Sequence, residues 1–123
     1  MPDDARSTVA CPDAIVTPDL PTVTDACGNV LTPSDPVISS TPACNGDVTY
    51  TYTYTDCAEH THNWTYTYII KDSIHPVIDG SIVAQPAVPP GSNCQFKVPN
   101  LVDMVRAIAS DNCTDRANLT ITQ

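Results

Sequence analysis

Two segments of the chain, residues 48–55 and 64–70, alternate between aromatic or apolar residues and threonine, with Ile69 as the one exception. A period of two is that of a strand with two unlike faces, so we predict an antiparallel hairpin. Residues directly opposite each other share a face, so even-numbered positions should pair with even-numbered ones. The aromatic side chains would then form the core face and the threonines the solvent face. The predicted pairs include Tyr52 with Tyr66 and Tyr50 with Tyr68.

The remaining sequence predicts shorter strands that are interrupted by proline. The chain of 123 residues contains 12 Pro, and both Pro and β-branched Thr disfavour helix interiors. One short helix is predicted over residues 101–109, with Asn100 as N-cap. Leu101, Val105 and Ile108 would form its apolar face. The sequence therefore predicts an all-β protein with one short helix.

The six cysteines fall into two copies of one pattern. Cys11 is followed by Cys27 in the context Thr-Asp-Ala-Cys, and Cys94 is followed by Cys113 in the context Ser-Asp-Asn-Cys. The copies lie roughly 85 residues apart, which is the length of one small domain. We therefore predict one whole module over residues 1–74 and the start of a second, truncated module over residues 75–123.

Strand length constrains how the cysteines pair. If residues 48–55 are extended at about 3.3 Å each, Cys44 and Cys57 lie about 30 Å apart, too far for a bridge. The chain is expected to run down, up and down between successive cysteines, which places the cysteines at alternating ends. Six cysteines allow fifteen connectivities, of which we predict Cys11–Cys44, Cys27–Cys57 and Cys94–Cys113.

Composition indicates where the protein works. Disulfides supplement a thin apolar core in exported domains, so an oxidising, extracellular compartment is expected. The N-terminus lacks the features of a signal peptide, so export signals are expected elsewhere in a longer parent chain. The net charge of −9 would repel nucleic acid and anionic lipid. No apolar run approaches the ~18 residues that span a membrane, so neither nucleic-acid binding nor membrane insertion is expected.

Residues 25–33, 42–58 and 64–68 resemble the repeats of very large surface adhesins of gliding Bacteroidetes. Such repeats are similar to hyaline-repeat (HYR) immunoglobulin-like modules, and residues 98–123 resemble a companion repeat type. The resemblance implies an exported, disulfide-linked, immunoglobulin-like β-sandwich module that acts in gliding motility or cell adhesion. It implies no catalytic residue and no particular ligand. One departure concerns the hairpin loop, which commonly reads Asp-Cys-Ala-Gly-Asn, whereas Glu59 and His60 follow Ala58 here.

Two groups of residues are candidate metal ligands. Asp25, Asp56 and Asp72 lie near turns or the module junction, where carboxylates can bind calcium and stiffen an array. The alternative is that they serve solubility, and no other cofactor is expected. His60 and His62 have a metal-binding spacing, but we interpret them as exposed loop residues because Cys57 is expected to be oxidised.

The solvent face of the hairpin is a candidate binding surface for polysaccharide or flat solid surfaces. Threonine also suits the solvent side of any strand. The aromatic residues of the opposite face could stack on sugars, but a chain this poor in Leu and Phe needs them for its core. The candidate binding residues are Thr49, Thr51, Thr53, Thr55, Thr65 and Thr67.

No catalytic constellation is recognisable in the sequence. A nucleophile elbow and a glycine-rich phosphate loop are missing, and a single Glu leaves no pair of catalytic glutamates. We therefore predict a non-catalytic repeat of a cell-surface adhesin, which acts as a spacer and through weak multivalent contacts, with neighbouring repeats as partners. The alternative prediction is a carbohydrate-binding module of a secreted enzyme.

Overall fold

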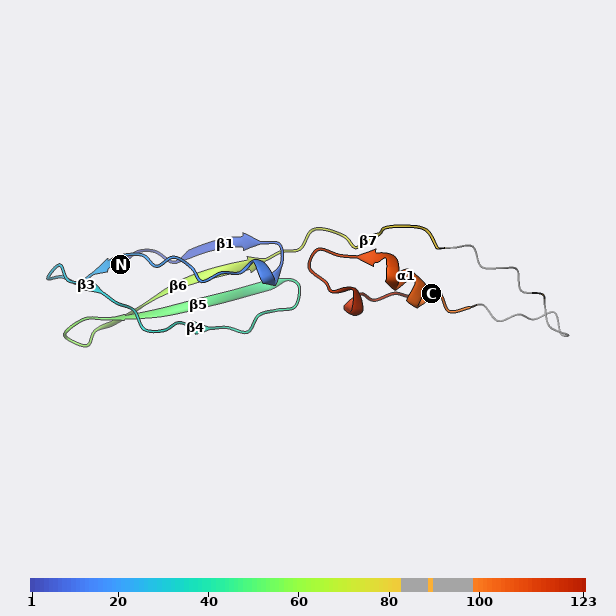
Figure 1. The fold of residues 1–123 in the computed structure, drawn as a ribbon. Coiled ribbons are helices and arrows are strands. Elements are labelled where there is room, and N and C mark those ends of the chain that lie inside the picture. The colour runs from blue at the N-terminus through green and yellow to red at the C-terminus, as the bar shows by residue number, and fades with distance from the viewer. Residues whose placement is uncertain (83–88, 90–98) are drawn as a thin grey trace. The chain divides into compact units, whose positions relative to one another are not determined.

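A computed structural model describes residues 1–82, 89 and 99–123 of the chain. These residues form small β-sheets and one short α-helix, as Figure 1 shows. The chain divides into two compact units, Met1–Ser73 and Ile74–Gln123. Each unit is described separately below.

The first unit is built around a long antiparallel hairpin, β5 (Gly46–Thr55) and β6 (Thr61–Ile70). Even-numbered residues pair with even-numbered ones, which confirms the predicted faces. The predicted register is wrong by two residues, because Tyr50 lies opposite Tyr66 and Tyr52 opposite Trp64. The error arose from the length expected for the connection between β5 and β6. Strand β6 begins at Thr61, so the connection is shorter than the loop expected before residue 64.

The even-numbered face of the hairpin forms the core. Buried side chains fall into two clusters, one around Tyr54 and Trp64 and the other around Val48 and Ile70. Tyr50 and Tyr66 are half-buried between them. The rings are therefore packed in the core and form no exposed sugar-stacking platform, as predicted. Among the described residues, the buried aromatic side chains are those of Tyr52, Tyr54, Trp64 and Tyr68.

Two further strands complete a four-stranded sheet in the order β1-β6-β5-β4. Strand β1 (Ala5–Val9) runs parallel to β6, and strand β4 (Val37–Ile38) runs antiparallel to β5. Ser39, the residue after β4, reinforces the pairing. The backbone N–H of Ser39 donates to the carbonyl of Thr49 at 3.0 Å, and the Ser39 hydroxyl accepts the N–H of Thr49 at 3.0 Å.

A separate two-stranded sheet, β2 (Val23–Thr24) and β3 (Val30–Leu31), packs on the core face. Val23 is buried in the same cluster as Tyr54, and Leu31 packs against that cluster. Proline interrupts the rest of this layer, since Pro lacks the N–H that a sheet ladder needs. The second layer is thus much less regular than the predicted immunoglobulin-like sandwich, although the mostly β character is confirmed. The prolines that flank these strands are Pro12, Pro18, Pro21, Pro33, Pro36 and Pro42.

The second unit contains β7 (Val77–Ile78), helix α1 (Val102–Ile108) and β8 (Ala109–Ser110), with β7 antiparallel to β8. The helix is one residue shorter at each end than predicted. The prediction of Asn100 as N-cap is wrong, because the N-cap is Leu101, which makes no side-chain capping bond. Asn100 lies one residue earlier, and its side chain accepts the N–H of Val102 at 2.9 Å. Two single-turn 3₁₀ helices occur in the described part of the chain, Pro12–Ala14 in the first unit and Arg116–Asn118 in the second.

Candidate functional site

The turn between β5 and β6 is closed by one aspartate. Asp56 Oδ1 accepts the backbone N–H groups of Ala58 at 2.8 Å and His60 at 2.9 Å. Asp56 Oδ2 lies 2.9 Å from His60 Nδ1, a contact that becomes an ion pair when the imidazole is protonated. The backbone closes the turn as well, because the N–H of Asp56 donates to the carbonyl of His60 at 3.0 Å.

The turn between β2 and β3 repeats this arrangement contact for contact. Asp25 Oδ1 accepts the N–H groups of Cys27 at 2.9 Å and Asn29 at 2.8 Å. Asn29 Nδ2 donates to Asp25 Oδ2 at 2.9 Å, and the N–H of Asp25 donates to the carbonyl of Asn29 at 2.9 Å. Asn29 therefore occupies the place that His60 takes in the other turn. We call these two segments, residues 25–29 and 56–60, the twin turns.

The fourth residue of each twin turn adopts a left-handed backbone conformation. Gly28 has φ +85° and Glu59 has φ +64°. Glycine adopts this region freely, whereas a residue with a Cβ is strained there. The second turn thus has the geometry of the first, although Glu59 and His60 take the places of Gly28 and Asn29. His60 supplies the side-chain donor, and Glu59 adopts the positive φ despite its Cβ.

Hydrogen bonding sets the acidity of both turn carboxylates. The side-chain and backbone donors of Asn29 hold the pKa of Asp25 below its ordinary value, against a smaller opposing effect of the Asp56 charge. The side-chain hydrogen bond of His60, followed by its backbone N–H, lowers the pKa of Asp56 in the same way. Both groups are therefore ionised at neutral pH and stabilise their turns as carboxylates.

The twin turns flank one cavity of about 270 Å³ at the same end of the first unit. Charged and apolar groups from both hairpins meet in this cavity, as they do in many ligand sites. His62, which was expected in a loop, lies on β6 opposite Tyr54 and is exposed. The residues that line the cavity are Met1, Val23, Thr24, Asp25, Leu31, Tyr54, Asp56, His60, Thr61 and His62.

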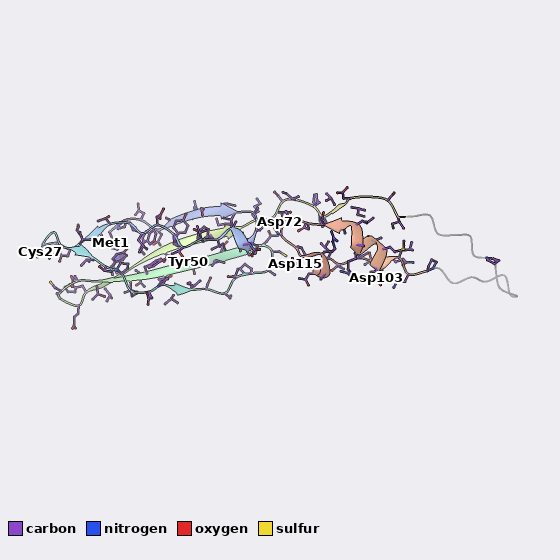
Figure 2. The ribbon with its side chains drawn as sticks, in the orientation of Figure 1. Met1, Cys27, Tyr50, Asp72, Asp103 and Asp115 are labelled. Carbon is purple, nitrogen blue, oxygen red and sulfur yellow. The ribbon has the colours of Figure 1, made fainter. Side chains whose placement is uncertain are left out.

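The three aspartates proposed as calcium ligands do not come together. Asp25 and Asp56 line the same cavity, but Asp72 follows the other end of β6, where its N–H donates to Asn45 at 3.0 Å. Figure 2 shows Cys27 of the first twin turn and Asp72 at opposite ends of the first unit. Within the described residues, no three Asp, Glu, His or Cys side chains are grouped as metal ligands. The three-aspartate site is therefore not assembled.

The six candidate threonines share one face of the hairpin. Thr49 lies opposite Thr67, Thr51 opposite Thr65, and Thr55 opposite Thr61. In the one break of this ladder, Thr53 lies opposite Asn63, and its hydroxyl donates to the Asn63 carbonyl oxygen at 2.9 Å. The face is polar and uncharged along these four pairs.

The cysteines lie at the predicted ends of the first unit, but neither of its two predicted bridges is formed. Cys27, Cys44 and Cys57 are free and exposed, which excludes Cys11–Cys44 and Cys27–Cys57 from this structure. Cys11 and Cys113 each take part in a disulfide. Cys94 lies outside the described residues, and so does the predicted bridge to it.

Sequence reasoning did not recognise that residues 56–60 form a turn equivalent to the one at residues 25–29. Residues 25–29 read Asp-Ala-Cys-Gly-Asn and residues 56–60 read Asp-Cys-Ala-Glu-His. Both have an aspartate at the first position and an amide or imidazole donor at the fifth. That shared spacing was the available signal, because an aspartate side chain that caps its own turn is a recurrent local motif.

Comparisons with known proteins place the first unit in a family. No helix among the described residues is long and apolar enough to cross a membrane. No curated protein and no solved structure matches the chain. The family model described as "HYR-like domain with 4 cysteines" matches residues 1–70, a segment that holds Cys11, Cys27, Cys44 and Cys57. This non-catalytic domain type is typical of extracellular multidomain proteins. The chain belongs to the family of HYR-like domains with four cysteines.

Proposed function

We propose that the chain is part of an exported cell-surface adhesin, in which the HYR-like unit is a spacer that withstands tension. An array of such repeats would hold a distal surface contact away from the cell and transmit force along the chain. The family membership supports the extracellular, non-catalytic part of this proposal. The gliding-adhesin context rests on the resemblance of residues 8–72 to those repeats.

The parallel pairing of the first and last strands of the unit carries the proposal. Ala5 pairs with Tyr66 and Val9 with Ile70, so β1 and β6 run in the same direction. Tension along the chain enters β1 at its first residue and leaves β6 at its last. The two strands are therefore pulled in opposite directions along their common axis, which shears all the hydrogen bonds between them at once.

We call the pairing of β1 with β6 the clamp. Further hydrogen bonds extend the clamp beyond the paired residues at both ends. On the N-terminal side, Trp64 Nε1 donates to the carbonyl of Asp3 at 2.8 Å, and the N–H of Thr65 donates to Asp4 Oδ1 at 2.8 Å. On the C-terminal side, the N–H of Lys71 donates to the carbonyl of Val9 at 2.9 Å. A rupture in shear must break these contacts together with the strand pairing.

Single-molecule force spectroscopy on the full chain, held at its two termini, tests the clamp. We expect an unfolding event whose length gain corresponds to the first unit and whose force falls in the Asp4→Ala variant, because the acceptor for Thr65 is lost. Asp13→Ala is the matched control, since Asp13 is an exposed aspartate of the first 3₁₀ helix and lies outside the clamp. Unfolding at a force indistinguishable from zero, or equal losses in both variants, would contradict a spacer that bears tension.

The threonine face supports the second part of the role, a weak contact repeated along an array. In a chain of net charge −9, its four cross-strand pairs hold hydroxyl, methyl and amide groups without a charge. Such a face suits neutral polysaccharide, and repetition converts weak binding into avidity. Retention of the full chain on insoluble glycans should fall for Thr51→Lys and persist for Thr41→Lys, which lies off this face. Equal retention would remove the face from the proposal.

A further inference from the structure

One residue of the threonine face is apolar. Ile69 stands in β6 where the alternation would place a threonine. Tyr68 and Ile70 on either side of it are buried in the core, so the side chain of Ile69 lies on the opposite face of the sheet. It is half-buried there. An aliphatic group therefore follows the last threonine pair of the hairpin, Thr49 with Thr67.

Neighbouring strands flank Ile69 on both sides, because β6 lies between β1 and β5 in the sheet (Figure 1). Directly paired residues of adjacent strands share a face. Val9 of β1 packs on the core, so the even-numbered residues of β1 lie on the threonine face with Ile69. Two rows of side chains thus cross the three strands, and we call these six residues the Ile69 patch. From β1 through β6 to β5, the rows are Thr8, Ile69 and Asp47, and Arg6, Thr67 and Thr49.

The Ile69 patch carries one charge of each sign. Arg6 and Asp47 are both exposed. Strand β6 lies between them, so the strands that carry them are about 10 Å apart, two strand spacings. Within the described part of the chain, neither side chain has a hydrogen-bond or ion-pair partner. A guanidinium only donates hydrogen bonds and a carboxylate only accepts them. The patch therefore offers free donors on one side of Ile69 and free acceptors on the other.

This arrangement suits a neutral ring that carries hydroxyl groups. Ligand sites combine apolar contact with a few placed polar groups. A pyranose unit of a polysaccharide has a C–H face that can pack on an aliphatic side chain such as Ile69. The hydroxyl groups at its rim both donate and accept hydrogen bonds. One ring can therefore use the donors of Arg6 and the acceptors of Asp47 at the same time.

The charges of the patch and of its surroundings disfavour other classes of ligand. The first unit holds ten acidic residues against two basic ones, a net charge of −8, which repels a polyanion. A basic peptide would be repelled by Arg6. An apolar surface would cover Arg6 and Asp47 without giving either one a partner, which is unfavourable. A neutral polysaccharide avoids all three costs.

We propose that the Ile69 patch binds one pyranose unit of a neutral polysaccharide. The ring lies on Ile69, one of its hydroxyl groups accepts from Arg6, and another donates to Asp47. The threonine pairs that continue from Thr49 and Thr67 along the hairpin contact the following sugar units. The inference rests on the proposed role of the threonine face and locates the strongest contact of that face.

Retention of the full chain on microcrystalline cellulose, measured as a binding isotherm at pH 7, tests the apolar contact. Ile69→Thr completes the alternation of β6 and should weaken retention roughly fivefold, since part of the aliphatic contact is lost. Val37→Thr is the matched control, because Val37 is an exposed residue of β4 that lies opposite Thr51 on the same face. It should bind like the wild type. Equal weakening in both variants would overturn a contact centred on Ile69.

Two charge-removing variants test the polar contacts. Arg6→Gln and Asp47→Asn should each weaken retention roughly tenfold, because each loses a hydrogen bond to a charged group. Asp13→Asn should leave retention unchanged, since Asp13 is exposed in the first 3₁₀ helix and lies outside the sheet. The fluorescence of Trp64, the only Trp of the chain, reports through the unfolding midpoint whether each variant is folded. Folded Arg6→Gln and Asp47→Asn variants that bind like the wild type would overturn the proposal.

The inference and the proposed function fail in different ways. If Thr51→Lys abolishes retention while the Ile69, Arg6 and Asp47 variants bind like the wild type, the threonine face binds glycan without the patch. Absence of wild-type retention both on cellulose and on curdlan, a second neutral glycan, would overturn the patch and the glycan-binding face together. Tighter binding to alginate, a polyuronate, than to either neutral glycan would contradict a neutral ligand.

Discussion

Replacement of Glu59 by Gly tests whether the second twin turn is strained. Glu59 has φ +64°, while the equivalent position of the first turn is Gly28 with φ +85°. Among the described residues, Glu59 is the only non-glycine residue with a positive φ. Its side chain is exposed, so removal of that side chain takes little packing away. The substitution therefore changes mainly the backbone energy of the turn.

Two opposing effects determine how much Glu59→Gly changes the free energy of unfolding. A residue with a Cβ pays about 1–2 kcal/mol in the left-handed region, and Gly avoids that cost. Gly also makes the unfolded chain more flexible, which destabilises the fold by about 0.4–1 kcal/mol. We expect Glu59→Gly to stabilise the first unit by about 0.5–1 kcal/mol, the balance of those two effects. For a unit of this size, the unfolding midpoint should rise by roughly 2–8 °C.

Urea and thermal unfolding, followed by the fluorescence of Trp64 at one fixed redox condition, measure this balance. Ala58→Gly is the matched control, because Ala58 lies in the same turn without a positive φ. It should destabilise by about 0.4–1 kcal/mol, since only the unfolded-state effect remains. Glu59→Gln separates the loss of charge from the relief of strain and should change little. If Glu59→Gly destabilises as much as Ala58→Gly does, the reasoning is wrong.

Three further predictions concern the core and the turn carboxylates. Tyr52→Phe should stabilise the unit or leave it unchanged, because the buried Tyr52 hydroxyl has no hydrogen-bond partner in the described structure. Tyr54→Phe should instead cost about 0.5–1.5 kcal/mol in a urea titration, because the hydroxyl donates to Pro21. Asp56→Asn should weaken the unit at pH 7, and this difference should vanish as the pH falls through and below 3.8, because the folded-state pKa of Asp56 is lowered from that value. Burial raises the pKa of Tyr52, Tyr54 and Tyr68 above 10.0, so stability should be retained below pH 10 and lost above it, with phenolate absorbance appearing as the unit unfolds.

The faces of the hairpin could be predicted from the sequence because the side-chain period of a strand is two. Every Tyr of β5 and β6, together with Val48 and Ile70, lies on the face where alternation placed it. Register depends on a different quantity, the length of the connection. The contacts of Asp56 with residues 58 and 60 close the turn early, so pairing begins at Thr55 and Thr61. A strand pattern contains no information about that closure.

Tertiary placement explains the other differences. Asp72 was grouped with Asp25 and Asp56 because all three lie near turns or a junction in the sequence. A ten-residue strand, β6, separates the end where Asp72 lies from the twin turns. The length of β5, ten residues, likewise separates Cys44 from Cys57. Distances along one regular strand can thus be calculated from sequence, whereas the approach of β2 and β3 to that strand depends on packing around Val23.

The twin turns show that two segments of one chain can make the same set of contacts with different residues. The aspartate needs two backbone donors and one side-chain donor at the fifth position, and both the Asn29 amide and the His60 imidazole supply the last of these. The amide does so at every pH, whereas the imidazole adds a charge when it is protonated. His60→Asn should therefore keep the second turn closed, while His60→Ala should lower the unfolding midpoint, because Asp56 Oδ2 then loses its partner. Equal midpoints for the Asn and Ala variants would mean that the backbone contacts alone hold the turn.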